Sequence, residues 1–150
     1  MNHTKTTFAS LGGGANEAPP PETPSLWTYR APAVVWALLL FALSSIPNLP
    51  SPFHVFSFDD KIEHVGAYAI LGALAVRAVA MRRHVPNWPD VGLAFIMCTM
   101  YGMLDEFHQF FVPGRSVDYL DFAADTVGSI LGAVVYLAMC RRWRLHRLLG

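Results

Sequence analysis

Long runs of apolar residues follow one another along the chain, and they predict helices that cross a membrane. The runs cover residues 32–47, 64–81, 91–112 and 122–140, with more polar stretches between them. A spanning α-helix needs about 20 residues. The last three runs reach that length with their polar ends, whereas the first reaches it only with its flanks. The pattern therefore predicts an all-α fold, a four-helix transmembrane bundle.

The composition agrees with a membrane protein, because 53% of the 150 residues are hydrophobic and only 15% are charged. An ordinary soluble domain is less apolar and more highly charged. The basic residues are few and scattered, which argues against nucleic acid as a partner. The two cysteines, Cys98 and Cys140, lie within or at the end of apolar runs, and we expect both to be free thiols.

The chain divides into three parts by composition. Residues 1–29 are rich in Gly, Pro, Ala and Thr, so we expect a disordered N-terminal tail. Residues 30–140 hold the four apolar runs and form the predicted transmembrane domain. Residues 141–150 form a basic, cytoplasmic C-terminal tail that suits anionic lipid. No small-residue cleavage site closes the first run, so we expect the first span to stay in the mature protein.

The basic residues predict the orientation of the spans. They precede the first run, lie between the second and third, and follow the fourth: Lys5, Arg30, Arg82, Arg83, Arg141, Arg142, Arg144 and Arg147. Basic residues near the ends of spans stay in the cytoplasm. Four spans with both termini cytoplasmic satisfy this distribution, so we expect a multi-pass protein of the cytoplasmic (inner) membrane.

Acidic residues gather at the opposite, outer ends of the second, third and fourth spans. They are Asp59, Asp60, Glu63, Asp105, Glu106, Asp118, Asp121 and Asp125. At about 100° per helical residue, the polar positions of each helix fall on one face. That face holds Lys61, His64 and Tyr68 on the second helix, Asp105, Glu106 and Gln109 on the third, and Asp118, Asp121 and Asp125 on the fourth. These three helices are therefore predicted to pack around a common polar core.

Two local patterns refine this prediction. The segment 112–116, Val-Pro-Gly-Arg-Ser, predicts a tight turn that makes the third and fourth helices antiparallel neighbours. The turn is expected to bring Arg115 over the acids, and either Ser116 or Asp118 can cap the fourth helix. Gly128 and Gly132 have the GxxxG spacing, which predicts close packing between helices.

The acids outnumber the outer cations, which are only Lys61 and Arg115. An uncompensated charge inside a membrane is costly, so the acidic cluster needs a partner or a proton. Proton sharing, a bound cation and a cationic ligand each provide this relief. The carboxylates expected to share protons are Asp105, Glu106, Asp121 and Asp125. No ligand spacing indicates a metal site or a cofactor.

His64 is the titratable group that most readily pairs with these acids. If it faces Glu106 or Asp121, the pair can donate and accept a proton, and these three residues are our candidate catalytic groups. Tyr68 lies one turn along the same helix face. We expect Tyr68 to pack with its hydroxyl satisfied inside the cluster.

Two stretches of sequence, DDKIEHVGAYAILG at 59–72 and DEFHQFFVPGRSVDYLDFAADTVGSILG at 105–132, resemble the VanZ-like family of small bacterial membrane proteins. The likeness extends from residue 44 to residue 132, and the family is named after a teicoplanin-resistance determinant. The resemblance implies a four-helix membrane protein, linked in some members to reduced sensitivity to teicoplanin-type antibiotics. Together with the convergence of the polar helix faces, it leads to our predicted ligand-binding site, which consists of Asp60, Lys61, His64, Tyr68, Asp105, Glu106, Gln109, Arg115, Asp121 and Asp125. The family pattern usually carries Asn at the position of Asp125.

Our leading hypothesis is an outward-facing polar site that binds or acts on an envelope lipid or a glycopeptide-antibiotic-related headgroup, and that lowers teicoplanin sensitivity. Lys61 and Arg115 would hold an anionic lipid headgroup such as phosphate. Glu106 with His64 or Asp121 would move a proton. Two other classes remain open: a proton or cation transporter, because of the excess of acids, and an accessory structural membrane subunit. The sequence indicates no particular protein partner.

Overall fold

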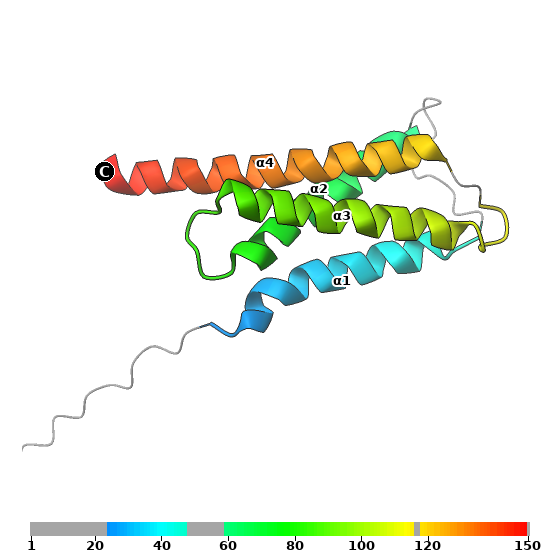
Figure 1. The fold of residues 1–150 in the computed structure, drawn as a ribbon, viewed down its shortest axis with the longest axis horizontal. Helices are drawn as coiled ribbons and strands as arrows, with labels where there is room; N and C mark the ends of the chain where they lie inside the picture. The colour runs from blue at the N-terminus through cyan, green and yellow to red at the C-terminus, as the bar shows by residue number, and fades with distance from the viewer. Residues whose placement is uncertain (1–23, 48–58, 116–117, 150) are drawn as a thin grey trace, which may run out of the picture.

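The computed structural model describes residues 24–47, 59–115 and 118–149, and four helices account for most of them (Figure 1). The helices are α1 (Leu26–Ser44), α2 (Asp59–Ala80), α3 (Trp88–Gln109) and α4 (Tyr119–Leu149). No strand occurs in the described residues. The predicted all-α fold with four helices is confirmed.

Three of the helices, α1, α2 and α4, are long and apolar enough to cross a membrane. Helix α3 also has 22 residues, but it is not among these three; Asp90 lies in its first turn, and Asp105 and Glu106 lie near its end. It packs along both α2 and α4. The protein is therefore a membrane protein by the length and composition of its helices.

The bounds of α1 and α4 differ from the expected domain boundaries. Helix α1 begins at Leu26, within the stretch expected to be a tail, and the Ser25 side chain accepts a hydrogen bond from the Trp27 amide, which caps the helix. Residues 1–23 of the expected tail lie outside the described residues. Helix α4 continues to Leu149, because arginine and leucine, which fill much of 141–149, are strong helix formers.

The closest packing in the bundle joins α2 to α4, and it depends on glycines. A Cβ atom placed on Gly72, Gly128 or Gly132 would overlap the backbone of the facing helix, at Ser129, Val65 and Ala69 respectively. Only glycine lets the two backbones approach this closely. The close packing predicted from Gly128 and Gly132 is confirmed.

The apolar core lies in the half of the bundle that is away from the start of α4. It is built from α1, α2, α3 and α4 and includes Leu40, Leu71, Val76, Ala94, Cys98 and Leu137. Cys98 and Cys140 are both free thiols, as expected. Helix α1 packs mainly on α2 and touches α3 little. It leaves large apolar side chains such as Val35 and Leu38 exposed, and such a surface suits lipid.

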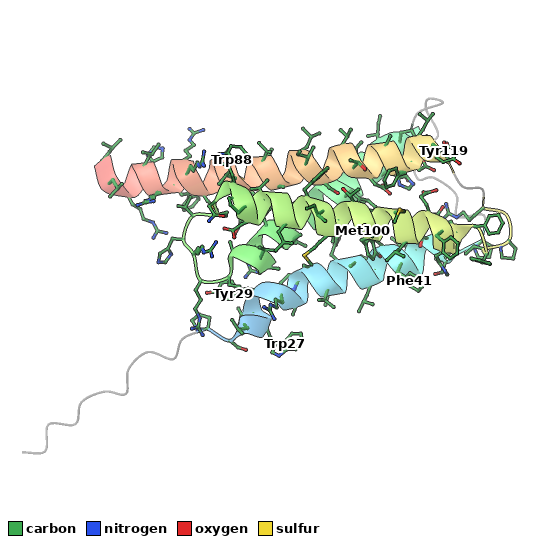
Figure 2. All side chains as sticks on the ribbon, in the orientation of Figure 1. Trp27, Tyr29, Phe41, Trp88, Met100 and Tyr119 are labelled. Atoms are coloured by element: carbon green, nitrogen blue, oxygen red, sulfur yellow. The ribbon has the colours of Figure 1, made fainter. Side chains whose placement is uncertain are left out.

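Aromatic side chains lie toward both ends of the helices (Figure 2). Trp27 and Tyr29 lie at one end, and Tyr119 lies at the other. Membrane-spanning helices commonly carry tryptophan and tyrosine at the two membrane–water interfaces. Their placement is consistent with helices that cross a bilayer.

The connection between α3 and α4 has the predicted tight turn. The Arg115 amide donates a hydrogen bond to the Val112 carbonyl over 3.1 Å, and Gly114 has a positive φ of 80°, as a type II turn requires. The Asp118 side chain then accepts a hydrogen bond from the Leu120 amide over 2.9 Å and caps α4. The alternative cap, Ser116, lies outside the described residues.

Candidate functional site

Buried polar residues concentrate at the end of the bundle where α1 and α3 stop and α2 and α4 begin, on the right in Figure 1. We call this end the acidic end. Its buried polar side chains are Ser44, Asp105, Glu106, Gln109 and Asp125, each less than a tenth exposed. Helical periodicity brings them together, because each occupies the inward face of its helix. Buried charges need partners, so the contacts of these residues define what the site can do.

Lys61 is the centre of a group of ion pairs between α2 and α4. Its ammonium lies 3.0 Å from Asp60 and 2.7 Å from Asp118, and it also contacts the Asp121 carboxylate. The hydrogen bond from Lys61 holds the pKa of the Asp118 carboxyl below its ordinary value. With three carboxylates around it, Lys61 has little positive charge to offer an added anion.

His64 pairs with Asp125 more closely than with the residues expected from the sequence. The distance from His64 Nδ1 to Asp125 Oδ1 is 2.8 Å, whereas His64 Nε2 and Asp121 Oδ2 are 4.0 Å apart. The prediction named Glu106 or Asp121 as the partner. Asp125 is nearer because the tight contact at Gly128 draws that turn of α4 against α2 beside His64.

Three buried polar atoms of this cluster have no hydrogen-bond partner among the described residues: Tyr68 Oη, Glu106 Oε1 and Asp125 Oδ2. The Tyr68 hydroxyl, which was expected to be satisfied inside the cluster, makes no well-formed hydrogen bond with a described residue, although the Asp125 carboxylate lies near it. The other Glu106 oxygen accepts a hydrogen bond from the Asp118 amide over 3.1 Å. Tyr68 and Asp125 Oδ2 lie beside the same residue, Gly102, where each is 3.3 Å from the position that a Cβ atom would take. Native proteins leave few such atoms, and each calls for an explanation.

Substituting Tyr68 by phenylalanine tests this assignment. We expect the free energy of unfolding to rise by about 1 kcal/mol, because the change removes a buried hydroxyl that has no partner. Tyr101→Phe is the matched control, since the Tyr101 hydroxyl donates a hydrogen bond of 2.6 Å to the Ala37 carbonyl. The Tyr101→Phe change should lower the free energy of unfolding by about 1 kcal/mol, because it removes this hydrogen bond. The measurement is reversible unfolding in mixed micelles, and equal losses in both variants would contradict the assignment.

Helix α1 contributes to the polar cluster, which the sequence prediction missed. The Ser44 hydroxyl donates a hydrogen bond of 2.6 Å to Asp105 Oδ1, and the Gln109 amide donates one of 3.1 Å to Asp105 Oδ2. Ser45 and His108 approach to 2.9 Å at the same level. The signal was present in the sequence, because two serines follow one another at the end of an otherwise apolar run. The cluster therefore joins four helices rather than three.

Arg115 contacts the end of α1, and it lines one pocket with the acids Asp60, Glu63 and Asp105. Its guanidinium points to the carbonyl oxygens of Leu43 and Ile46, each 3.4 Å away. These carbonyls belong to the C-terminal end of α1, where a helix attracts positive charge. Within the described part of the chain, no carboxylate forms an ion pair with Arg115.

A polar pocket of about 210 Å³ opens between α1, α2 and α3 at the acidic end. Its lining brings together Leu40, Leu43, Ser44, Asp60, Glu63, His64, Ala67, Tyr68, Asp105, Gln109 and Arg115. Most of the expected site residues therefore converge on one pocket. Lys61, Glu106, Asp121 and Asp125 are absent from its described lining, and they lie toward α4 instead.

An apolar groove of about 590 Å³ lies along the same three helices, farther from the acidic end. Its lining residues include Ala33 and Ala37 of α1, Leu71 and Ala75 of α2, and Met97 and Tyr101 of α3. On each helix, these residues lie three or four positions apart and in line with the residues that line the polar pocket. The two cavities therefore follow the same helix faces. The hydrogen bond between Tyr101 and Ala37 joins α3 to α1 within the lining of the apolar groove.

The chemistry of the polar pocket is that of recognition. Asp105 and Arg115 supply opposite charges, and His64 supplies an imidazole that can donate or accept a hydrogen bond. In the described ranges, no group of three or more His, Cys, Asp or Glu residues has the geometry to hold a metal ion. The pocket therefore offers hydrogen bonds and charges to a polar organic group.

Comparison with known proteins adds a family to this geometry. The family model described as VanZ/LLP1 matches residues 20–141, which include every described residue of the polar cluster. No curated protein and no solved structure matches the chain.

Proposed function

Since the chain belongs to the VanZ/LLP1 family, we propose that it is a multi-pass protein of the bacterial inner membrane that binds an envelope lipid at its acidic end. The lipid headgroup would occupy the polar pocket, and an acyl chain would follow the apolar groove along α1. Both termini would face the cytoplasm, because basic residues lie at the end opposite the acids. Helix α3 would then cross the membrane with its neighbours.

The position of the two cavities along the same faces of α1, α2 and α3 supports an amphiphilic ligand. The polar pocket lies at the membrane end of the helices, where a headgroup resides, and the apolar groove continues it toward the bilayer centre. The groove has a volume within the range of known small-molecule sites, about 300–1,000 Å³. A ligand with a polar head and an apolar tail would fill both the polar pocket and the apolar groove.

The observation that carries the proposal is a pair of opposite charges in one pocket, Asp105 and Arg115, neither of which forms an ion pair within the described residues. Asp105 is 6% exposed and accepts hydrogen bonds from two neutral groups, while Arg115 donates to two carbonyl oxygens. A headgroup that carries both a phosphate and an amine would pair with both residues. Lys61, expected earlier to share the anion, is already surrounded by three carboxylates.

Of the candidate catalytic residues, His64 is the one that lines the polar pocket. Its Nδ1 atom is held by Asp125, an arrangement that fixes the orientation of the imidazole ring. If the protein also acts chemically on its ligand, we propose that His64 moves the proton. Glu106 and Asp121 would act through His64, because they lie farther toward α4.

Two other functional classes are less well supported. Cation transport requires a polar path through the membrane, but Leu71, Val76, Ala94 and Leu137 fill the interior beyond the acidic end. An accessory structural role accounts for the contacts that join helices, such as Ser44 with Asp105. It gives no reason for three buried polar atoms that lack partners.

Lipid binding by Arg115→Gln tests the proposal. We expect the affinity for dioleoylphosphatidylethanolamine, measured by native mass spectrometry of the purified protein, to fall about tenfold with the loss of one charge-assisted contact. Dioleoylphosphatidylglycerol has the same phosphate without the amine, so at this site the parent protein should bind it more weakly than it binds dioleoylphosphatidylethanolamine. The matched control is Arg142→Gln, which removes a charge at the other end of the molecule.

An unchanged affinity in Arg115→Gln, or an equal loss in Arg142→Gln, would contradict the proposed site. A second readout is the concentration of teicoplanin that inhibits cells producing the parent or the variant. Lowered teicoplanin sensitivity is part of our proposal, and it predicts that cells with Arg115→Gln are more sensitive than cells with the parent protein. Equal production of both proteins in the membrane must be verified by immunoblot.

A further inference from the structure

The last turns of α4 extend beyond the ends of α2 and α3, at the end of the molecule opposite the acidic end (Figure 1). Residues 141–149 of this extension include Arg141, Arg142, Arg144 and Arg147. Arg141 lies over the ring of Trp88, 5.4 Å from its centre, and this contact attaches the base of the extension to α3. The basic segment is therefore helical, and its first residue is attached to α3.

A cavity of about 710 Å³ lies between this extension and the connection from α2 to α3. Its lining residues are His84, Val85, Met139, Cys140, Trp143, Arg144, Arg147 and Leu148. The lining thus combines two guanidinium groups and an imidazole with several apolar side chains. None of these residues belongs to the polar cluster at the acidic end.

The two lining arginines have positive charge available. No carboxylate in the described part of the chain forms an ion pair with Arg144 or Arg147. They are three residues apart, so they project from the same side of α4 and can contact one phosphate together. Guanidinium groups match phosphate oxygens with paired hydrogen bonds. Either tautomer of His84 adds an N–H donor.

The apolar part of the lining indicates a lipid and not a free anion. Trp143 and Leu148 are 66% and 72% exposed, and they line the same cavity as the two arginines. A soluble phosphate would leave these side chains in water, whereas an acyl chain would cover them. Basic pockets at the ends of membrane helices are suited to the headgroups of anionic phospholipids.

We propose that the cavity between the α4 extension and the α2–α3 connection is a binding site for an anionic phospholipid, with the phosphate on Arg144 and Arg147 and an acyl chain along Trp143 and Leu148. The site is separate from the one proposed at the acidic end. It would attach the basic end of the protein to anionic lipid and fix its depth in the membrane.

Substitution of single arginines tests the site, because α4 supplies a matched control. At about 100° per residue, Arg142 projects roughly opposite to Arg144 and Arg147, so Arg142→Gln removes the same charge from the same helix but from another face. The measurement is native mass spectrometry of the full-length protein with added dioleoylphosphatidylglycerol. We expect Arg147→Gln to weaken binding about tenfold, and Arg142→Gln to leave it within about twofold of the parent.

Three outcomes would overturn the proposal. Equal weakening in both variants would show attraction by the overall charge and no site. Unchanged binding in Arg147→Gln would place the lipid elsewhere. Competition by millimolar inorganic phosphate, added as sodium phosphate, would show a site for the free anion.

A fluorescence experiment gives a second readout that does not depend on the folding of an arginine variant. Phosphatidylglycerol brominated on its acyl chains quenches tryptophans that it contacts. We expect quenching in the parent and a clearly smaller quenched fraction in Trp143→Phe. An identical quenched fraction in the two proteins would overturn the position of the acyl chain.

Discussion

Replacing Gly132 by alanine should lower the free energy of unfolding by about 3 kcal/mol, the upper end of the usual cost of overpacking. The added Cβ atom would overlap the backbone carbonyl group of Ala69 on α2. Backbone atoms cannot turn aside as a side chain can, so α2 and α4 would have to separate. This contact joins the two helices that pack most closely, and its loss would loosen the acidic end as well. The measurement is reversible unfolding in mixed micelles.

Gly66→Ala is the matched control for this prediction. Gly66 lies on α2, and a Cβ atom there would meet no atom within 4 Å. Alanine has a higher helix propensity than glycine by about 1 kcal/mol, so this variant should be as stable as the parent or more stable. If Gly132→Ala were as stable as Gly66→Ala, α2 and α4 would not be in contact at Ala69.

Lys61→Met should also lower the free energy of unfolding by about 3 kcal/mol, because it leaves a partly buried carboxylate without its cation. The side chain of Asp121 is only 13% exposed, whereas those of Asp60 and Asp118 are 52% and 39% exposed. Water can solvate the two more exposed carboxylates, so most of the loss should come from Asp121. The thermal unfolding midpoint in detergent provides the measurement.

A second substitution separates this loss from a simple packing defect. Asp121→Asn removes the carboxylate that Lys61→Met leaves without its cation. The double variant should therefore recover at least half of the free energy of unfolding that Lys61→Met alone loses. Asp121→Asn alone should be destabilising, because it weakens the ion pair with Lys61. Additive losses in the double variant would mean that the two residues do not interact, which would contradict the ion pair.

Local sequence patterns were sufficient to predict the helices and the faces that they bury. The length of an apolar run determines whether it can cross a membrane, and the spacing of polar residues determines which face turns inward. For this reason Asp105, Gln109 and Asp125 were expected to be inside, and each is less than a tenth exposed. The spacing of Gly128 and Gly132 likewise predicted close packing between helices, because such packing needs small residues one turn apart.

The partners of individual side chains could not be predicted in this way. His64 shares a helix face with Lys61, yet it pairs with Asp125 while Lys61 pairs with Asp121. Which of two carboxylates one turn apart meets which cation depends on how far α2 and α4 slide along each other. That offset is decided by the contact of Gly132 with Ala69, which no single helix contains.

Three features could be predicted from the chain alone: four helices, an inward polar face on α2, α3 and α4, and the concentration of acids at one end and of bases at the other. These features are local, because they depend on run length and helical period alone. Other features appear only when the helices pack together: Ser44 of α1 meets Asp105, Arg115 turns to α1, and the same faces of three helices line both the polar pocket and the apolar groove. The physical reason is that contacts between helices depend on their tilt and offset, and these follow from the packing of all four helices at once.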